Sequence, residues 1–395
     1  MQYLGAIFET ASQELRSLRN RPADIFMLAI MPIVWCALII GLFGEGLMRD
    51  LPVGMVNLDH SVESIELESK IDAIASTRLV SYASTHEAQN ALLEGKIYAY
   101  IQIDREWQSQ KGTPQARAIE LYFPKSLYAI ATSLELDIKQ ALLAIQIEEA
   151  QALVRQAGLT SDQAEKLTHT VSVNTVTVGN MAFNFQAYIL PTLIPGILHL
   201  ALVIAVCTRL ITLWRERQVK EWLDSAKGNI ICAYLGKVLP WWVVFTFYGL
   251  IYIALVTGYY GWSIQGSALL WMFGIGFFFF VMTLFPLPLI AIFIKLDWVF
   301  VLSCAVGYMA PIFPYIGFSY PLESMAKWVQ WLAQLFPLTH YFAFQGEQWI
   351  LNSHWETSLL TLSKLALFGI FWAATGYALF CRRVKEAYDE ETNHA

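Results

Sequence analysis

Residues 25–61 read IFMLAIMPIVWCALIIGLFGEGLMRDLPVGMVNLDHS, and this stretch decides the fold. Its first part, from Ile25 to Gly44, carries no charged residue. A helix needs roughly 20 residues to cross the hydrocarbon core of a bilayer, so this part is long enough to span a membrane. The segment 51–57, LPVGMVN, has the composition of a short strand and follows almost at once. The stretch therefore predicts a membrane helix that leads directly into a folded domain.

The composition of the whole chain is that of a membrane protein. Hydrophobic residues make up 56% of it and charged residues only 15%, whereas charged residues are about 25% of an ordinary globular domain. The first span is preceded by arginines but lacks an Ala-x-Ala cleavage site, so we interpret it as an uncleaved helix. Six transmembrane helices are predicted, at about 25–45, 187–208, 236–259, 267–293, 298–319 and 363–381.

The basic residues of the short loops define the orientation. With six spans they all fall on one side: Arg16, Arg19, Arg21, Arg209, Arg215, Arg217, Lys220, Lys227, Lys295, Arg382, Arg383 and Lys385. The positive-inside rule makes that side cytoplasmic, with both termini inside. The region 49–180 then lies outside, and it holds the entire excess of acidic residues behind the net charge of −6.

The outer region has the pattern of an α/β domain. Ser84 and Glu87 have capping-box spacing at the start of a helix that Gly95 ends. Ser61 caps an earlier helix, and apolar residues recur at helical spacing from Ser126 to about Ala157. Strands are predicted at 51–57, 96–103, 117–123 and 171–178.

The predicted fold class is an α-helical integral membrane protein with six transmembrane helices and an inserted α/β extracytoplasmic domain. The predicted divisions are a cytoplasmic or interfacial amphipathic helix (1–24), transmembrane helix 1 (25–47), the extracytoplasmic α/β domain (48–184), transmembrane helices 2–6 (185–381) and a cytoplasmic tail (382–395). Within 185–381 we place a cytoplasmic coupling loop at 214–235 and an outer-leaflet helical segment at 320–352.

Several segments together resemble the permeases of the ABC-2 exporter family that carry a large extracytoplasmic insertion. They are the Arg-rich leading segment, the single span, LPVGMVNLDHS (51–61) and THEAQNALLEGKIYAYIQID (85–104). The resemblance covers nearly the whole chain. It implies the membrane-spanning permease subunit of an ATP-binding-cassette exporter in the bacterial cytoplasmic (inner) membrane, which moves an amphipathic or lipid-like substrate or drug outward.

The resemblance also implies partners. A separate nucleotide-binding ATPase subunit uses ATP and Mg, and a second permease subunit, identical or a close paralogue, completes the translocation path. Membrane lipid and a periplasmic adaptor are further candidate partners, and no nucleic acid is expected. No cofactor is expected on this chain itself, because it contains no G-x-x-x-x-G-K-[ST] loop.

The basic loop WRERQVKEWLDSAKGNIICAYLGKVLP (214–240) resembles the segment that docks on the ATPase in this family. Gly236 and Lys237 match a Gly-Lys before the third span, whereas Gln218 replaces the usual second Glu of an Arg-Glu-Arg-Glu stretch and Lys220-Glu221 a usual Gly-Thr. A general positive-inside anchor is the alternative interpretation. The resemblance assigns ATPase coupling to Arg16, Arg19, Arg215, Glu216, Arg217, Lys220 and Glu221.

The N-terminal segment before the first span is predicted to lie flat in the membrane interface. Its apolar side is formed by Leu4, Ile7, Phe8, Leu15 and Leu18, and its arginines can meet lipid phosphates. The resemblance implies that this helix also touches the ATPase. A simple topology signal would explain the arginines but not the apolar stripe.

The segment FPLTHYF (336–342) resembles a Pro-Leu-Thr-x-Tyr stretch of the family near the exit of the path. In the family this stretch is followed by short outer-leaflet helices. An aromatic belt at the membrane interface explains Trp328, Trp331 and Trp349 equally well. Within the second span His199 is either a neutral, packed histidine or a titratable group of the path. The candidate residues of a path or gate are Pro195, His199, Pro337, Thr339, His340 and Tyr341.

Enzymatic chemistry has no candidate site. The sequence contains no H-E-x-x-H, no G-x-S-x-G and no cysteine spacing typical of a metal site, so we predict no catalytic residue and no metal. The main alternative function is a membrane-anchored extracytoplasmic interaction or assembly protein without transport activity. A secondary transporter is a weaker alternative, since internal repeats and several intramembrane charges are missing.

Overall fold

The computed structural model describes residues 2–43, 49–110, 119–123, 128–156, 185–317 and 321–393. These residues form two compact units. One, the membrane unit, contains helices α1 to α3 and α9 to α17, and the other, the inserted unit, contains α4 to α7 and a four-stranded sheet. The strand predicted over 171–178 lies outside the described residues.

The inserted unit is an α/β domain, as predicted. Its sheet has the order β2-β1-β3-β4, in which β1 pairs in parallel with β2 and β3, and β4 runs antiparallel to β3. The strands are β1 (Leu51–Asn57), β2 (Thr77–Ser81), β3 (Ala99–Ile103) and β4 (Glu120–Tyr122). The helices are α4 (Val62–Asp72), α5 (Thr85–Leu93), α6 (Trp107–Gln110) and α7 (Tyr128–Gln156).

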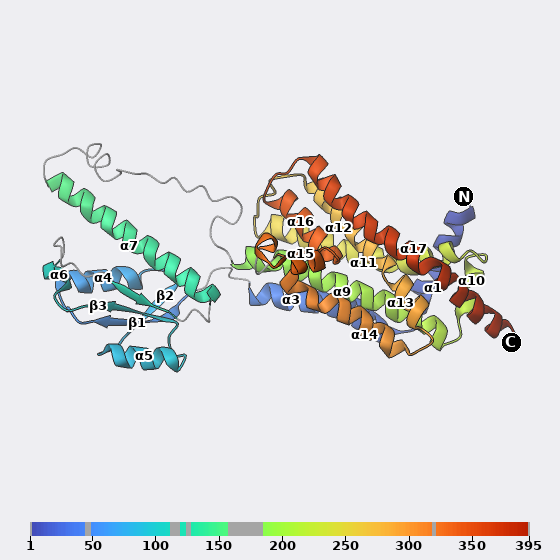
Figure 1. The fold of residues 1–395 in the computed structure, drawn as a ribbon, viewed down its shortest axis with the longest axis horizontal. Helices are drawn as coiled ribbons and strands as arrows, with labels where there is room; N and C mark the ends of the chain where they lie inside the picture. Colours follow the sequence, from blue (N-terminus) through green and yellow to red (C-terminus); the bar gives the residue numbers. More distant parts are fainter. Residues whose placement is uncertain are drawn as a thin grey trace. The chain divides into compact units, whose positions relative to one another are not determined.

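The central strand β1 is buried on both faces of the sheet. Helices α4 and α7 cover one face of the sheet and α5 covers the other (Figure 1). Val53 and Met55 pack with residues of α4 and α7, whereas Val56 packs with α5. This position explains why LPVGMVN is almost continuously apolar instead of alternating. Gly54 is required there, because a Cβ atom would lie 2.9 Å from the Cβ atom of Tyr100.

Helices α4 and α5 begin at the N-cap residues that the sequence predicts, Ser61 and Ser84. The Ser61 hydroxyl accepts a hydrogen bond from the Ser64 amide. Ser84 accepts one from the Glu87 amide, and the Glu87 carboxylate in turn accepts one from the Ala83 amide. Gly95 follows α5 with a φ of 72°, which an L side chain rarely adopts. Strand β2 was not predicted, since its sequence TRLVS is short and carries an arginine.

The membrane unit contains the six predicted spans. Six helical runs among the described residues are long and apolar enough to cross a bilayer: Pro22–Leu42, Gln186–Arg215, Ile230–Tyr259, Ala268–Phe293, Trp298–Tyr315 and Trp355–Asn393. Their helices are α2 (Pro22–Ile25), a π-helical turn (Phe26–Ile30), α3 (Met31–Leu42), α9 (Phe185–Arg215), α11 (Ile230–Ala254), α12 (Ala268–Leu284), α13 (Pro286–Phe293), α14 (Trp298–Met309) and α17 (Trp355–Asn393). Shorter helices are α1 (Gln2–Arg19), α10 (Val219–Ser225), α15 (Lys327–Ala333) and α16 (Pro337–Trp349).

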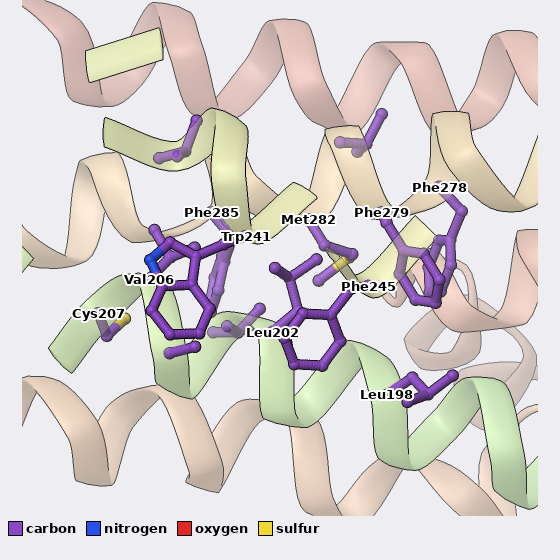
Figure 2. Close-up of a cluster of buried hydrophobic side chains, with 14 of the residues drawn as sticks. Leu198, Leu202, Val206, Cys207, Trp241, Phe245, Phe278, Phe279, Met282 and Phe285 are labelled. Atoms are coloured by element: carbon purple, nitrogen blue, oxygen red, sulfur yellow. The ribbon is translucent and has the colours of Figure 1, made fainter. Parts of the chain in front are cut away.

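The core of the membrane unit lies between α9, α11 and α12. Leu202, Phe245 and Met282 come from these three helices and meet in the middle of the cluster shown in Figure 2. The first span and the run that contains α14 are the least buried of the six. The unit therefore has a dense centre and two peripheral spans.

One feature extends the sequence-based expectations and another differs from them. The helix that contains the sixth span begins at Trp355 and continues to Asn393, since residues 382–393 contain no proline or glycine and seven of the twelve are Arg, Lys, Glu or Ala. Trp349, one of the three tryptophans interpreted as an aromatic belt, is buried and stacks on Trp262 with ring centroids 4.9 Å apart. Trp328 and Trp331 are exposed.

Both ends of the chain lie at the same end of the membrane unit. Helix α1 and the last turns of α17 both contact α10 (Figure 1). We call this region, made of α1, α10 and the last turns of α17, the terminal end. The region made of α15, α16 and the first turns of α17 is called the opposite end.

Candidate functional site

Helix α1 packs closely along α11 at the terminal end. The closest approach is at Gly236, where a Cβ atom would lie 2.6 Å from the Ile7 carbonyl oxygen and 2.6 Å from the Thr10 Cβ atom. Only a glycine leaves room for α1 at this distance. The Thr10 hydroxyl is 2.9 Å from the hydroxyl of Ser225, so α1 also contacts α10.

A buried carboxylate, that of Glu14, joins α1 to the second and third spans. The Arg209 Nε atom of α9 lies 2.7 Å from one carboxylate oxygen, and the Lys237 Nζ atom of α11 lies 2.5 Å from the other. The Trp241 indole also donates a hydrogen bond to Glu14, over 3.2 Å. All four side chains are almost entirely buried.

Arg209 is shared with a second acid. Its guanidinium lies 2.6 Å from the Asp24 carboxylate and donates a hydrogen bond of 2.7 Å to the Ser17 hydroxyl. We call Glu14, Asp24, Arg209 and Lys237 the charge cluster. It contains two negative and two positive groups, so each buried charge has a counterion, which is the condition for burying charges at all.

The charges around Glu14 outweigh its burial. Burial alone would raise the pKa of the Glu14 carboxyl, because it disfavours the charged form. Lys237 and Arg209 stabilise the carboxylate more strongly, and the pKa of Glu14 lies below its ordinary value. Glu14 is therefore ionised at neutral pH, and the cluster exists as ion pairs.

A polar cavity of about 600 Å³ opens between α1 and α10 beside the charge cluster. Its lining includes Glu9, Gln13, Arg21, Gln218 and Glu221. The Gln13 amide donates a hydrogen bond of 3.0 Å to the Glu221 carboxylate across the cavity. Because the cavity is polar and open at the surface, it can receive a polar segment of another molecule.

Two of the residues predicted for ATPase coupling, Arg16 and Glu221, line this cavity, and two others make defined contacts. Glu216 forms an ion pair with Arg21, and this hydrogen bond lowers the pKa of the Glu216 carboxyl. The Arg215 guanidinium lies 5.1 Å from the ring centroid of Trp298, a distance typical of a cation–π contact. The structure thus holds two of the three residues of the Arg-Glu-Arg stretch in defined contacts.

Of the other predicted coupling residues, four are exposed at the surface: Arg16, Arg19, Arg217 and Glu221. Arg217 follows α9 with a φ of 54°, and the next amide, of Gln218, donates to the Leu213 carbonyl over 2.9 Å. Arg16 and Arg19 lie on the exposed side of α1. Lys220, the remaining member of the predicted set, is half-buried at the start of α10.

The apolar residues predicted to form one side of the N-terminal helix fall into two groups, one exposed and one packed against the protein. Leu4, Phe8 and Leu15 are exposed, as a helix lying in a membrane interface requires. Ile7 and Leu18 instead pack against the core of the membrane unit.

The candidate path residues are buried, and two of them, His199 and Tyr341, contact the same phenylalanine. His199 lies 5.8 Å from Phe278, which stacks on Tyr341 with ring centroids 4.5 Å apart. Pro195 is buried on the same helix as His199. Pro337, Thr339 and His340 are buried as well, at the start of α16. Their role in a path stays a prediction, since within one chain these side chains pack between helices.

A glutamine compensates for the proline in the second span. Pro195 has no amide hydrogen, so the carbonyl of Pro191, four residues earlier, lacks its helical donor. The Gln345 side-chain amide of α16 supplies that donor over 2.7 Å. The Tyr341 hydroxyl in turn donates to the Gln345 side-chain oxygen over 3.3 Å. Helix α16 is thus fixed to the break in α9.

Glu14 is not identified from the sequence as a functional residue. Arg209 appears there only among the basic residues that define the orientation. A signal exists for Glu14, which lies on one helix face with the small residues Ala6 and Thr10, at spacings of four. A small face predicts close packing, and an acid on it requires a buried partner. Among the residues that the structure describes, no group of three or more His, Cys, Asp or Glu side chains could hold a metal.

Comparison with known proteins identifies one family. A family profile described as "ABC-2 family transporter protein" matches residues 23–378. A comparison with curated proteins finds no match. The matched range contains the inserted unit and most of the membrane unit, so the match concerns the chain as a whole.

Proposed function

The chain belongs to the ABC-2 transporter family, and from this membership we propose that it is the permease subunit of an ATP-driven exporter. Members of the family form the membrane component of ABC transporters. The sequence has no P-loop, so a separate ATPase subunit has to bind ATP and Mg and supply the energy. The terminal end is assigned to the cytoplasm on the basis of its basic loops.

The observation that carries the proposal is the arrangement of α1, α10 and the charge cluster. Arg16 and Glu221 line a polar cavity that is open to solvent. Arg19, at the end of α1, and Arg217, two residues before α10, are exposed. We assign this surface to docking of the ATPase, because charged groups at the rim of an interface steer and orient a partner. A push on α1 would reach the second and third spans through Glu14, which binds both.

The transport path is assigned to the interface between two permease subunits. The first span and α14 are the least buried in the single chain, as expected of helices that meet a second copy. An apolar groove of about 310 Å³ lies between the first two spans and is lined by Met27, Met31, Trp35 and Ile204, among others. Flexible methionines beside a tryptophan suit an amphipathic or lipid-like substrate.

The inserted unit is assigned to the extracytoplasmic side. The first span separates it from the basic N-terminal segment, and it carries the acidic excess of the chain. There it would contact the substrate or an adaptor. Among its described residues no group of three or more His, Cys, Asp or Glu side chains could hold a metal ion, and we assign to it binding instead of metal-dependent chemistry.

The test is affinity purification of the solubilised protein with and without the paired substitutions Arg215→Glu and Arg217→Glu. The wild type should retain a P-loop ATPase, and the variant should retain at least about tenfold less, because like charges at an interface cost several kcal/mol. The control carries Arg78→Glu and Arg105→Glu, the same charge change on exposed residues of the inserted unit. Absence of any ATPase from the wild type after gentle cross-linking would favour the membrane-anchored interaction protein instead.

A further inference from the structure

The last turns of α17 cap the short helix α10. The Glu391 carboxylate accepts hydrogen bonds from the first two amides of α10, those of Val219 at 3.1 Å and Lys220 at 2.8 Å. The amides of a first helical turn have no partner within the helix, and a carboxylate there is also favoured by the helix dipole. The preceding residue, Gln218, makes no side-chain cap of its own. Glu391 thus performs the capping task from a distant part of the chain.

A second contact holds the other end of α10. The Tyr388 hydroxyl donates a hydrogen bond of 3.0 Å to the Asp224 carboxylate. Between the two contacts the buried Trp222 packs edge-on against Phe380 of α17, with ring centroids 6.5 Å apart. Helix α17 therefore binds α10 at its start, at its middle and at its end.

Helix α1 contacts another part of α10. Ser225 lies within hydrogen-bonding distance of Thr10, and Glu221 accepts a hydrogen bond from Gln13. Helix α10 is thus held by two elements that differ in one respect. Helix α1 is tied to the second and third spans by the charge cluster, whereas α17 is itself the sixth span.

Helix α17 is unbroken from the sixth span to its contacts with α10. It contains 39 residues without a proline, which corresponds to a length of about 58 Å at 1.5 Å per residue. Figure 1 shows it running along most of the membrane unit and past α10 toward the C-terminus. A displacement of α10 is therefore transmitted to the sixth span without an intervening loop.

We infer that the C-terminal extension of α17 is a strut that positions α10 and ties it to the sixth span. Glu391 and Tyr388 are positioning residues of this strut, because they fix the helix next to the docking surface without belonging to its exposed rim. The inference rests on the proposed function in so far as α10 is the element that the ATPase moves. The strut itself is a property of the permease alone.

The experiment uses Glu391→Gln, with Glu390→Gln as the matched control. The Glu390→Gln substitution removes the same charge one residue away, at a side chain that is exposed. Hydrogen exchange of the purified, full-length permease should show the Val219 and Lys220 amides exchanging about tenfold faster or more in Glu391→Gln, since hydrogen bonds to a charged group are lost. The control should match the wild type, and Tyr388→Phe should accelerate exchange at the C-terminal turn of α10. Unchanged protection of α10 in both variants would overturn the inference.

A second measurement, transport per ATP hydrolysed, tests the role of the strut separately from the binding of the ATPase. The Glu391→Gln protein should still co-purify with the ATPase, because the exposed arginines are intact, but its transport per ATP hydrolysed should fall. Full coupling in a variant with an unprotected α10 would show that the strut does not position it for the ATPase. If no ATPase binds even the wild type, the proposed function fails, while the exchange result still decides whether the strut exists.

Discussion

The two ends of the membrane unit hold their helices together with different chemistry. At the terminal end, Glu14 is buried between Arg209 and Lys237, and full charges make the contacts. At the opposite end the polar contacts of the described residues are hydrogen bonds instead of ion pairs. Amides and hydroxyls donate them, and one carboxylate, that of Glu347, accepts them from Ser358 over 2.8 Å and from Thr361 over 2.7 Å. The Gln348 amide donates to the Ser358 hydroxyl over 2.6 Å, and Gln345 donates to the backbone of the second span.

The difference determines how firmly each end is fixed. Removing one partner of a buried ion pair costs about 3–5 kcal/mol, because the remaining charge is left unpaired. A hydrogen bond contributes only about 1 kcal/mol in net terms between neutral groups and about 1.5–3 kcal/mol when it is made to a charged group. We therefore expect α1 to move as one body with the second and third spans, and rearrangement during transport to occur more easily at the opposite end.

The largest effect is expected from Glu14→Gln. The substitution keeps the size of the side chain but leaves Lys237 buried without its counterion, so it should destabilise the protein by about 3–5 kcal/mol. Thermal unfolding in detergent measures this as a lower melting temperature. Glu9→Gln is the control, because Glu9 pairs with Arg16 at the surface of the same helix, where ion pairs contribute little.

A double substitution tests whether the loss comes from the unpaired charge. In Glu14→Gln with Lys237→Gln both groups of one pair are neutral, and Arg209 keeps Asp24 as its counterion. The double variant should lose clearly less stability than the sum of the single variants. Additive losses would show that the two groups are not coupled, and the contrast between the two ends would then have no basis.

A smaller effect is expected at the opposite end from Gln345→Leu. The Pro191 carbonyl would lose its donor while remaining buried, which costs about 1–3 kcal/mol. The melting temperature should fall by less than in Glu14→Gln. A loss as large as that of Glu14→Gln would contradict the contrast.

The proline itself provides the control for this prediction. Pro195→Ala restores an amide that can donate to the Pro191 carbonyl within the helix. In that background Gln345→Leu should cost little, because the carbonyl no longer depends on Gln345. An undiminished cost would show that Gln345 acts through another contact.

The fold was largely predictable because its determinants are local. Uncharged runs of membrane length identify six spans, and helix caps such as Ser84 with Glu87 identify helices of the inserted unit. The predictions failed where tertiary contacts decide. Trp349 was interpreted as part of an aromatic belt because of its residue type. It is buried instead, and it stacks on Trp262, which is 87 residues away in the sequence.

The candidate site was predictable only in its exposed part. The exposed arginines follow from the basic loop and from the family resemblance, whereas the charge cluster joins residues 195 positions apart, such as Glu14 and Arg209. Only the packing of α1 against Gly236 brings these groups together. The same holds for Glu391, which belongs to the segment 382–395, for which the sequence predicts only a cytoplasmic tail.

The smallest effect is expected from pH, and its sign follows from the lowered pKa of Glu14. A carboxyl whose pKa is lowered by folding stabilises the fold at any pH above its ordinary pKa of about 4.3. This contribution is lost as the pH falls through the pKa of the folded state. The difference in melting temperature between wild type and Glu14→Gln should therefore stay constant from about pH 7 to pH 5 and narrow only below about pH 4. Narrowing already near pH 6 would mean that burial outweighs Lys237 and Arg209, in which case the carboxyl would be protonated much more easily. The charge cluster would then be a pH-sensitive contact instead of a permanent one, and the terminal end would lose the firmness that distinguishes it from the opposite end.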